Sequence, residues 1–238
     1  MIELENPNFF SSIYALSLKS RSIISISGES GTGKTTLGLQ LISEVLINQM
    51  SEESKCVWIQ ASEQFPKKRL LSLFKSTPDQ IHYLLNNIYV YPVKSPFSNY
   101  REQSKFFNEL GTCLLPTNVR FIVIDNISHH LRFGASSCLD IKKKTILLDQ
   151  FFTSQLLPLI MRCLREKIAL ILIHEVSFNP NLERNQPFFN KLYSRIQEVS
   201  ITLSKIFNSK LNKMEIKASD LFTRTFAYEI RDTGLSRI

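Results

Sequence analysis

A glycine-rich run follows a short apolar segment near the beginning of the chain. The run Gly-Glu-Ser-Gly-Thr-Gly-Lys-Thr-Thr comes directly after the apolar residues 23–27. Glycines lack a Cβ, so backbone N–H groups can curl around a phosphate, and the N-terminus of a following helix adds the positive end of its dipole. The spacing therefore predicts a phosphate-binding loop between a strand and a helix. The expected nucleotide contacts are Gly28, Glu29, Ser30, Gly31, Thr32, Gly33, Lys34, Thr35 and Thr36.

Within this loop, Lys34 is expected to reach the β- and γ-phosphates of ATP, and the Thr35 hydroxyl to bind Mg²⁺. A carboxylate at the end of a buried strand can hold the same magnesium ion. Asp125 follows the four apolar residues 121–124 and is the predicted second magnesium ligand. The sequence thus predicts ATP and Mg²⁺ as cofactors.

The elements that must position these residues alternate along the chain. Apolar runs at 23–27, 56–60, 88–91, 121–124 and 169–173 predict strands, and helical periodicity is found at 33–50, 66–76, 100–115 and 145–166, the last with a kink at Pro158. Alternating strands and helices indicate an α/β fold with a mainly parallel sheet. Residues 199–206, 213–218 and 226–230 alternate in polarity, as antiparallel or edge strands do.

Composition narrows the class of protein further. The 238 residues carry a formal net charge of +8, which suits a phosphate-rich partner. The cysteines are scattered without a Cys-x-x-Cys pair, so neither a zinc site nor a disulfide framework is indicated, and a reducing compartment is expected. The first residues are acidic rather than basic and apolar, and polar residues interrupt the most apolar stretch. We therefore expect no secretory signal and no membrane contact.

Three stretches resemble a known family. They are residues 21–28 with the loop that follows, the run Val-Trp-Ile-Gln-Ala-Ser-Glu-Gln-Phe-Pro-Lys-Lys-Arg-Leu at 57–70, and the run Ile-Val-Ile-Asp-Asn-Ile-Ser-His-His-Leu-Arg at 122–132, with a weaker similarity at 226–234. They resemble the RecA-like recombinases, and within them the eukaryotic recombination-mediator paralogues of the kind found in budding yeast, which pair with a second paralogue. The resemblance implies a RecA-like P-loop ATPase core over residues 21–238, with a mainly parallel twisted sheet, flanking helices and antiparallel C-terminal strands.

The same resemblance implies a function and partners. It implies an accessory factor in homologous recombination and double-strand break repair, located in the nucleus. Its expected partners are single-stranded DNA, a second recombinase paralogue in a heterodimer, and the main recombinase. Residues 1–20 form a short N-terminal segment in which Phe9, Phe10, Ile13 and Leu16 make an apolar stripe. This stripe either contacts a partner or packs on the core.

DNA contacts are implied for the segment after Arg132. The family places its first DNA-binding loop there, over residues 133–144, and basic side chains on a loop can neutralise phosphates. The expected contacts are Arg132, Lys142, Lys143 and Lys144. Three adjacent lysines are also typical of the solvated start of a helix. The second family loop falls at 177–190, where Arg184 is the single basic residue, so this segment is a poor copy.

Hydrolysis is expected to be weak. Active members carry a water-orienting glutamate where an ungapped match places Ser62, and Glu63 stands one residue later. Glu63 is the candidate catalytic residue if the strand end twists towards the nucleotide. His174 and Glu175 replace the Asn-Gln pair that senses the γ-phosphate in the family. Glu175 would repel that phosphate unless a cation intervenes.

Other functions remain open from the sequence. An autonomous DNA-stimulated ATPase motor is the first alternative, and a small-molecule kinase on a P-loop core is the second. His129 and His130 are adjacent, so their side chains diverge and make a poor chelating pair. We therefore expect no metal at these histidines.

Overall fold

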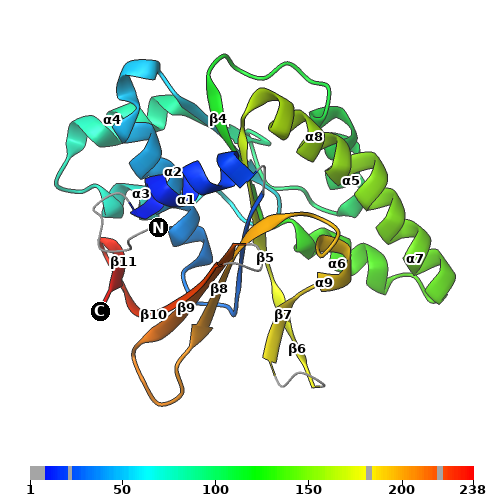
Figure 1. The fold of residues 1–238 in the computed structure, drawn as a ribbon. Coiled ribbons are helices and arrows are strands. Elements are labelled where there is room, and N and C mark those ends of the chain that lie inside the picture. Colours follow the sequence, from blue (N-terminus) through cyan, green and yellow to red (C-terminus); the bar gives the residue numbers. More distant parts are fainter. Residues whose placement is uncertain (1–8, 21–22, 181–183, 219–221) are drawn as a thin grey trace.

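The computed structural model describes residues 9–20, 23–180, 184–218 and 222–238, so residues 1–8 of the N-terminal segment and Arg21 lie outside the described part. Nine of the described strands form one large twisted sheet with helices on both faces, and β6 (Val176–Asn179) and β7 (Arg184–Pro187) form a separate small hairpin (Figure 1). Its strand order is β11-β10-β9-β8-β1-β5-β4-β2-β3. The strands are β1 (Ile23–Gly28), β2 (Lys55–Gln60), β3 (Ile88–Tyr91), β4 (Val119–Asp125), β5 (Ala169–His174), β8 (Glu198–Lys205), β9 (Asn212–Ala218), β10 (Phe222–Arg231) and β11 (Gly234–Arg237).

The pairing confirms a mainly parallel sheet with antiparallel C-terminal strands. Strands β3, β2, β4, β5, β1 and β8 run parallel to their neighbours, and β9, β10 and β11 continue the sheet antiparallel. The expectation that residues 199–206 form an antiparallel or edge strand is only half right, because β8 pairs in parallel with β1 and antiparallel with β9. Its alternating burial reflects one covered and one less covered face.

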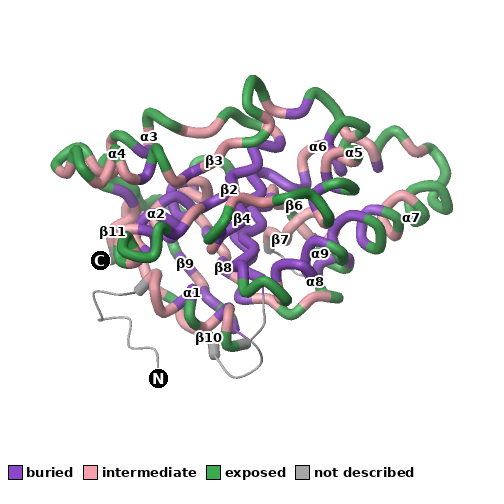
Figure 2. The backbone as a smooth tube through the Cα atoms, turned by 90° about the horizontal axis from the view of Figure 1, so that it is seen from above, coloured by how far each residue is buried: buried purple, intermediate pink, exposed green. Residues whose placement is uncertain are grey.

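Two helical layers enclose the sheet, and its strands carry the buried core between them (Figure 2). Helices α1 (Phe9–Ser20), α2 (Lys34–Asn48), α3 (Lys67–Leu73) and α4 (Pro78–Asn87) pack on one face. Helices α5 (Tyr100–Leu110), α6 (Ser128–Ser136), α8 (Leu157–Glu166) and α9 (Asn190–Tyr193) pack on the other. The apolar stripe of α1 lies against this core, with Ile13 buried and Phe10 and Leu16 partly buried. The side chain of Phe9 lies outside the described part.

The long helix that the sequence predicts at residues 145–166 differs from the observed one. It begins at Ile141 with α7 (Ile141–Gln150), widens into a π-helical segment at Phe151–Leu156, and continues as α8. Pro158 has no N–H to donate to the preceding turn, so the α-helical hydrogen bonding is interrupted and the π-helical segment lies just before it. Helix α4 was not anticipated, although Pro78 lies in its first turn and Ile81, Leu84 and Leu85 recur at helical spacing. No helix in the described ranges has the length and apolar character needed to span a membrane.

The C-terminal hairpin of β10 and β11 is fastened beside the phosphate loop. The Tyr228 hydroxyl donates a buried hydrogen bond to the Thr32 carbonyl at 2.6 Å. The Gln40 side chain accepts from Leu235 N at 2.7 Å, and Arg69 Nη2 donates to Arg231 O at 2.6 Å. The loop is therefore held from the antiparallel end of the sheet as well as by β1 and α2.

Tyr228→Phe tests this attachment. The change leaves the buried Thr32 carbonyl without its donor, so we expect the free energy of unfolding to fall by about 1–3 kcal/mol. Urea unfolding of the nucleotide-free protein measures it. Tyr91→Phe is the matched control, because Tyr91 is 41% exposed at the end of the edge strand β3. That control should stay within about 0.5 kcal/mol of the parent. Equal losses in the two variants would contradict the proposed attachment.

Candidate nucleotide-binding site

The phosphate loop joins β1 to α2, as the sequence predicted. Gly33 has φ +86° and forms the N-cap of α2, a left-handed conformation that glycine adopts without strain. A Cβ on Gly28 would lie 2.4 Å from the Leu203 carbonyl oxygen of β8. Glycine at this position therefore permits close approach of β1 to its neighbour. The loop backbone and the first turn of α2 line a pocket of about 530 Å³.

The predicted cation and magnesium ligands come together at this pocket. Lys34 Nζ donates to the Gly28 and Glu29 carbonyls at 2.9 Å each. Thr35 Oγ1 donates to Asp125 Oδ2 at 2.8 Å, although Asp125 is the last residue of β4, which β5 separates from β1. A hydroxyl and a carboxylate are hard oxygen donors of the type that Mg²⁺ prefers. The described residues hold no group of three His, Cys, Asp or Glu side chains able to form a metal cage, so a magnesium ion here would complete its shell with phosphate and water.

Burial dominates the electrostatics of this pair. Desolvation raises the pKa of Asp125 to about 6, while the hydrogen bond from Thr35 and the charge of Lys34 act in the opposite direction. Desolvation likewise lowers the pKa of Lys34, against the pull of Asp125, Glu175, Glu63 and Glu29. Burial therefore destabilises the ionised form of Asp125, and a cation beside the carboxylate stabilises that form.

The two candidates for the water-orienting position separate in space. Glu63 lines the pocket. Ser62 Oγ accepts a hydrogen bond from the Asn126 backbone N–H at 3.3 Å. The chain turns after β2 ends at Gln60, and this brings the second of the two side chains to the nucleotide side. The catalytic role of Glu63 stays a prediction, with a location that suits it.

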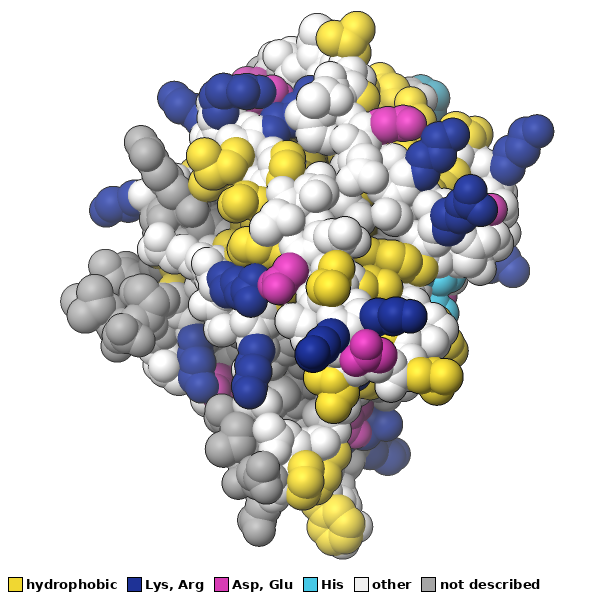
Figure 3. Space-filling view, turned by 90° about the vertical axis from the view of Figure 1, so that its right-hand side faces the viewer, with side chains coloured by type: hydrophobic (Ala, Val, Ile, Leu, Met, Phe, Trp, Pro, Cys, Tyr) yellow, Lys and Arg dark blue, Asp and Glu magenta, His cyan; other side chains and the backbone are white. Residues whose placement is uncertain are grey.

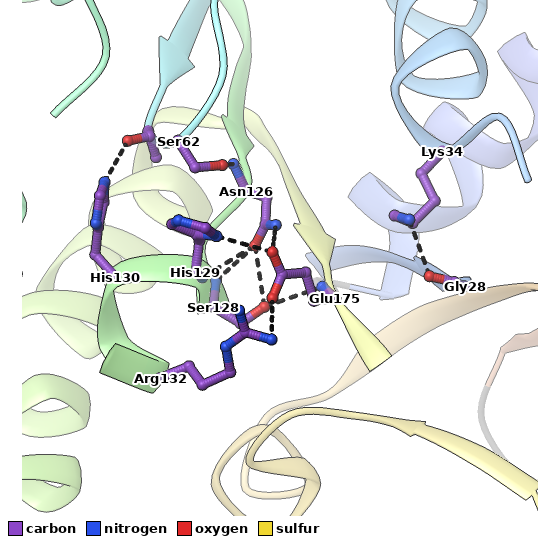
Figure 4. Close-up of polar contacts among 10 residues, drawn as sticks. Gly28, Lys34, Ser62, Asn126, Ser128, His129, His130, Arg132 and Glu175 are labelled. Atoms are coloured by element: carbon purple, nitrogen blue, oxygen red, sulfur yellow. Dashed lines mark hydrogen bonds and ion pairs between the residues drawn. The ribbon is translucent and has the colours of Figure 1, made fainter. Parts of the chain in front are cut away.

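Glu175 is the centre of a polar network on the pocket wall (Figure 4). Its Oε1 accepts from Asn126 Nδ2 at 3.0 Å and lies 2.9 Å from His129 Nδ1. Its Oε2 forms an ion pair with Arg132 Nη1 at 3.1 Å. The Glu175 backbone N–H donates to Ser128 Oγ at 3.0 Å. A cation, the Arg132 guanidinium, therefore lies beside Glu175.

Sequence analysis did not assign Asn126, Ser128 or His129 to the site. Two signals point to them in retrospect. Asn126 directly follows Asp125 at the end of β4, and His129 lies three residues before Arg132 on the same face of α6. Their partner Glu175 comes from another strand, so neither signal identifies the contact by itself.

Two further histidines, His130 and His174, do not line the nucleotide pocket. His130 Nε2 lies 3.0 Å from the Ala61 carbonyl oxygen. His174 is fully buried against Tyr193, with 4.4 Å between ring centroids, and burial lowers the pKa of His174 to about 3. Of the pair that replaces the family's sensor residues, only Glu175 faces the pocket. Neighbouring residues at a strand end point to opposite sides, which explains the difference.

The basic residues expected to contact DNA are not on a flexible loop. Residues 128–136 form α6, and Lys142, Lys143 and Lys144 occupy the exposed first turns of α7, so the predicted loop placement over 133–144 is wrong. Asp140 caps α7 by accepting from Lys142 N at 2.8 Å, and this capping favours helix over loop. Arg132 lines the nucleotide pocket. The DNA role of these four residues stays a prediction.

The second expected loop is a short hairpin. Strands β6 (Val176–Asn179) and β7 (Arg184–Pro187) pair antiparallel, while residues 181–183 and the Arg184 side chain lie outside the described part. Asn185 Nδ2 donates to Glu29 Oε1 at 2.9 Å. The hairpin therefore contacts the phosphate loop directly.

These features define a P-loop nucleotide-binding protein with a RecA-like α/β core. The family model described as Rad51 matches residues 8–184, and the chain belongs to the Rad51 family. The fold is similar to the crystal structure of the RadB recombinase, with a TM-score of 0.67 over 92% of this chain and 91% of that one. At 18% identity this likeness concerns the fold. A search of curated protein sequences finds no significant match.

Asp125→Asn tests the electrostatics of the magnesium position. A carboxyl pKa raised from 3.8 to about 6 in the folded state means that the ionised group destabilises the fold above pH 6, and that this cost vanishes as the pH falls towards 3.8. Without metal at pH 7.5, the Asn variant should therefore be more stable than the parent by up to about 3 kcal/mol. Urea unfolding at several pH values measures the difference.

The gain should shrink steadily between pH 6 and pH 4. Mg²⁺ with ATP should stabilise the parent and not the variant, because the amide is a weak magnesium ligand. A variant no more stable than the parent at pH 7.5 would refute the assignment of a destabilising buried charge.

Proposed function

We propose that this protein is a nucleotide-holding accessory factor of homologous recombination and double-strand break repair. It binds Mg²⁺ and ATP at the phosphate loop and single-stranded DNA on its basic surface. It works in the nucleus as a heterodimer with a second recombinase paralogue and assists assembly or stability of the main recombinase filament. Membership of the Rad51 family supports the recombination role. The finer assignments are part of the proposal.

The observation that carries the proposal is the contrast between two parts of one pocket. The phosphate-binding part is complete: Lys34 is held by the Gly28 carbonyl, Thr35 donates to Asp125, and all three side chains line the pocket. The opposite wall presents the Glu175 carboxylate in an ion pair with Arg132. A wall carrying an anion stabilises the charge that develops during phosphoryl transfer poorly. This contrast favours holding nucleotide over turning it over.

Charge and exposure support a DNA contact away from the pocket. Lys and Arg side chains are spread over the side of the molecule that carries α7, with apolar surface between them (Figure 3). Helix α7 buries none of its residues, and Leu139 and Ile141 beside its lysines are more than 80% exposed. Lysines with neighbouring apolar side chains suit a single strand, whose phosphates and bases are both accessible.

The edge of the sheet supports pairing with another chain. Strand β3 ends the sheet on one side, and Tyr91 at its end is 41% exposed. An uncovered edge strand offers backbone donors and acceptors to a strand from a partner. We propose this edge as a contact for the second paralogue.

The competing function, an autonomous ATPase motor, is favoured by the position of Glu63 in the pocket. ATP turnover with and without single-stranded DNA separates the two functions. We expect slow turnover in the parent, and a further fall in Glu63→Gln, because a water-orienting group is typically worth about 10²–10⁴-fold. Lys34→Ala gives the background, since it removes the loop's cation for the terminal phosphates.

Brisk DNA-stimulated turnover that Glu63→Gln abolishes would reject the accessory role and establish the motor. Failure of the parent to bind ATP at all would reject both functions.

The DNA contact is tested by replacing Lys142, Lys143 and Lys144 with Ala together. Each lysine at a phosphate releases less than one counterion from single-stranded DNA, about 0.7 per contact, so the slope of log affinity against log salt should flatten by up to about 2. Fluorescence anisotropy with a labelled oligonucleotide at several salt concentrations measures it. Lys67 and Lys68, exposed at the start of α3, supply the control double variant, which should leave the slope unchanged. An unchanged slope in the triple variant would place the contact elsewhere.

A further inference from the structure

The Glu175 carboxylate has the partners of a bound anion. An amide, an imidazole and a guanidinium converge on its two oxygens within 3.1 Å. Arg132 is fixed in addition by two aromatic rings, with its Cζ 5.0 Å from the centroids of Phe133 and Phe188. A guanidinium held in this way matches a phosphate as well as it matches a carboxylate. The arrangement is an anion clamp, which we define as Asn126, His129 and Arg132, and Glu175 fills it.

Two residues of the clamp, Asn126 and Arg132, line the nucleotide pocket. Strand β5 lies between β1 and β4, so Glu175 follows a strand end that lies between the ends of β1, which leads into the phosphate loop, and β4, which ends at Asp125. Glu175 and Arg132 both line the pocket together with Lys34. The charge of Glu175 also acts on Lys34, since it opposes the lowering of the Lys34 pKa. One carboxylate therefore interacts with both cations of the pocket.

The side chains that line the pocket carry a net negative formal charge. Its lining carries two basic side chains, Lys34 and Arg132, against four carboxylates, so the formal charge is +2 − 4 = −2. The carboxylates are Glu29, Glu63, Asp125 and Glu175. Each additional negative charge on a ligand is repelled by the surplus of carboxylates. The repulsion is strongest for the ligand group that lies nearest to a carboxylate.

We propose that Glu175 selects between nucleotides: its carboxylate competes with the terminal phosphate of a nucleoside triphosphate for Arg132 and Lys34, and the pocket therefore favours the diphosphate. A diphosphate places its groups at the loop N–H donors and leaves the anion clamp to Glu175. A triphosphate has to displace Glu175 from Arg132 or accept its repulsion. This inference rests on the proposed nucleotide-binding function and adds the preference of that site.

Glu175→Gln is the direct test, because it keeps the shape of the side chain and an oxygen acceptor while removing the charge. Affinities for ADP and for a non-hydrolysable ATP analogue are measured with Mg²⁺ by calorimetry on the full chain. The parent should bind ADP more tightly than the analogue. In the variant, the ratio of analogue affinity to ADP affinity should rise on the order of tenfold, since a like charge several ångströms away contributes at about this level.

Glu29→Gln is the matched control. It removes one carboxylate from the same pocket, but Glu29 sits in the phosphate loop and accepts from Asn185, whereas Arg132 pairs with Glu175. It should change both affinities by a similar factor and leave their ratio close to that of the parent. Arg132→Gln combined with Glu175→Gln should lower the ratio again, because the released guanidinium is the group that holds the additional phosphate.

The outcomes separate the inference from the function on which it rests. Both nucleotides binding to the parent, with the ratio unchanged in Glu175→Gln or changed equally in Glu29→Gln, would overturn the selecting role and leave nucleotide binding intact. Absence of binding to the parent would overturn the proposed function and the inference together. Urea unfolding of each variant identifies any loss of affinity that comes from loss of fold.

Discussion

Parallel hydrogen bonding among β1, β5, β4 and β2 brings the chemistry of this protein to one edge of the sheet. Ser27 pairs with His174, and Gln60 pairs with Asp125, so the residues that follow each strand emerge side by side. The phosphate loop, Glu175, Asp125 and Glu63 come from four distant parts of the sequence and share a pocket for this reason alone. A one-residue shift of register in one strand would displace the functional side chain that follows it. The shift would also turn the buried residues of that strand to the opposite face of the sheet.

The antiparallel half of the sheet supports this edge from the other side. Strand β8 approaches β1 so closely that Gly28 has no room for a Cβ, and Tyr228 of β10 holds the Thr32 carbonyl. The Arg69 guanidinium connects Thr36 to the β10–β11 turn, with Nε 3.2 Å from Thr36 Oγ1. Residues far from the strands that carry the pocket therefore help to hold the loop in place. Rigid placement of such donors is what makes a phosphate site effective without further contacts.

The pocket combines strong anion-binding geometry with an excess of carboxylates. Burial raises the pKa of Asp125, and Lys34 is influenced by four acidic neighbours. Magnesium would bring positive charge to the carboxylates, and the nucleotide phosphates would pair with Lys34, so the stability of the site depends on its ligands. Glu175 adds a carboxylate from the protein itself, which forms an ion pair with Arg132. A site balanced in this way suits a protein that is assembled or held by nucleotide more than one that consumes it.

The sequence alone determined the phosphate loop, the placement of Thr35 and Asp125 at one site, and the alternation of the main parallel strands with helices, because these follow from local residue types and spacing. Helix α4 was missed. It indicated that Glu175 would need a cation but did not name Arg132, which the family resemblance assigned to DNA instead. The choice between Ser62 and Glu63 depended on how the chain turns after β2. The helix starts at Ile141 because Asp140 caps it, although none of the residues of α7 is fully buried. Contacts between strand ends and the direction of a side chain after a strand arise from packing over long sequence separations, so only the tertiary structure decided them.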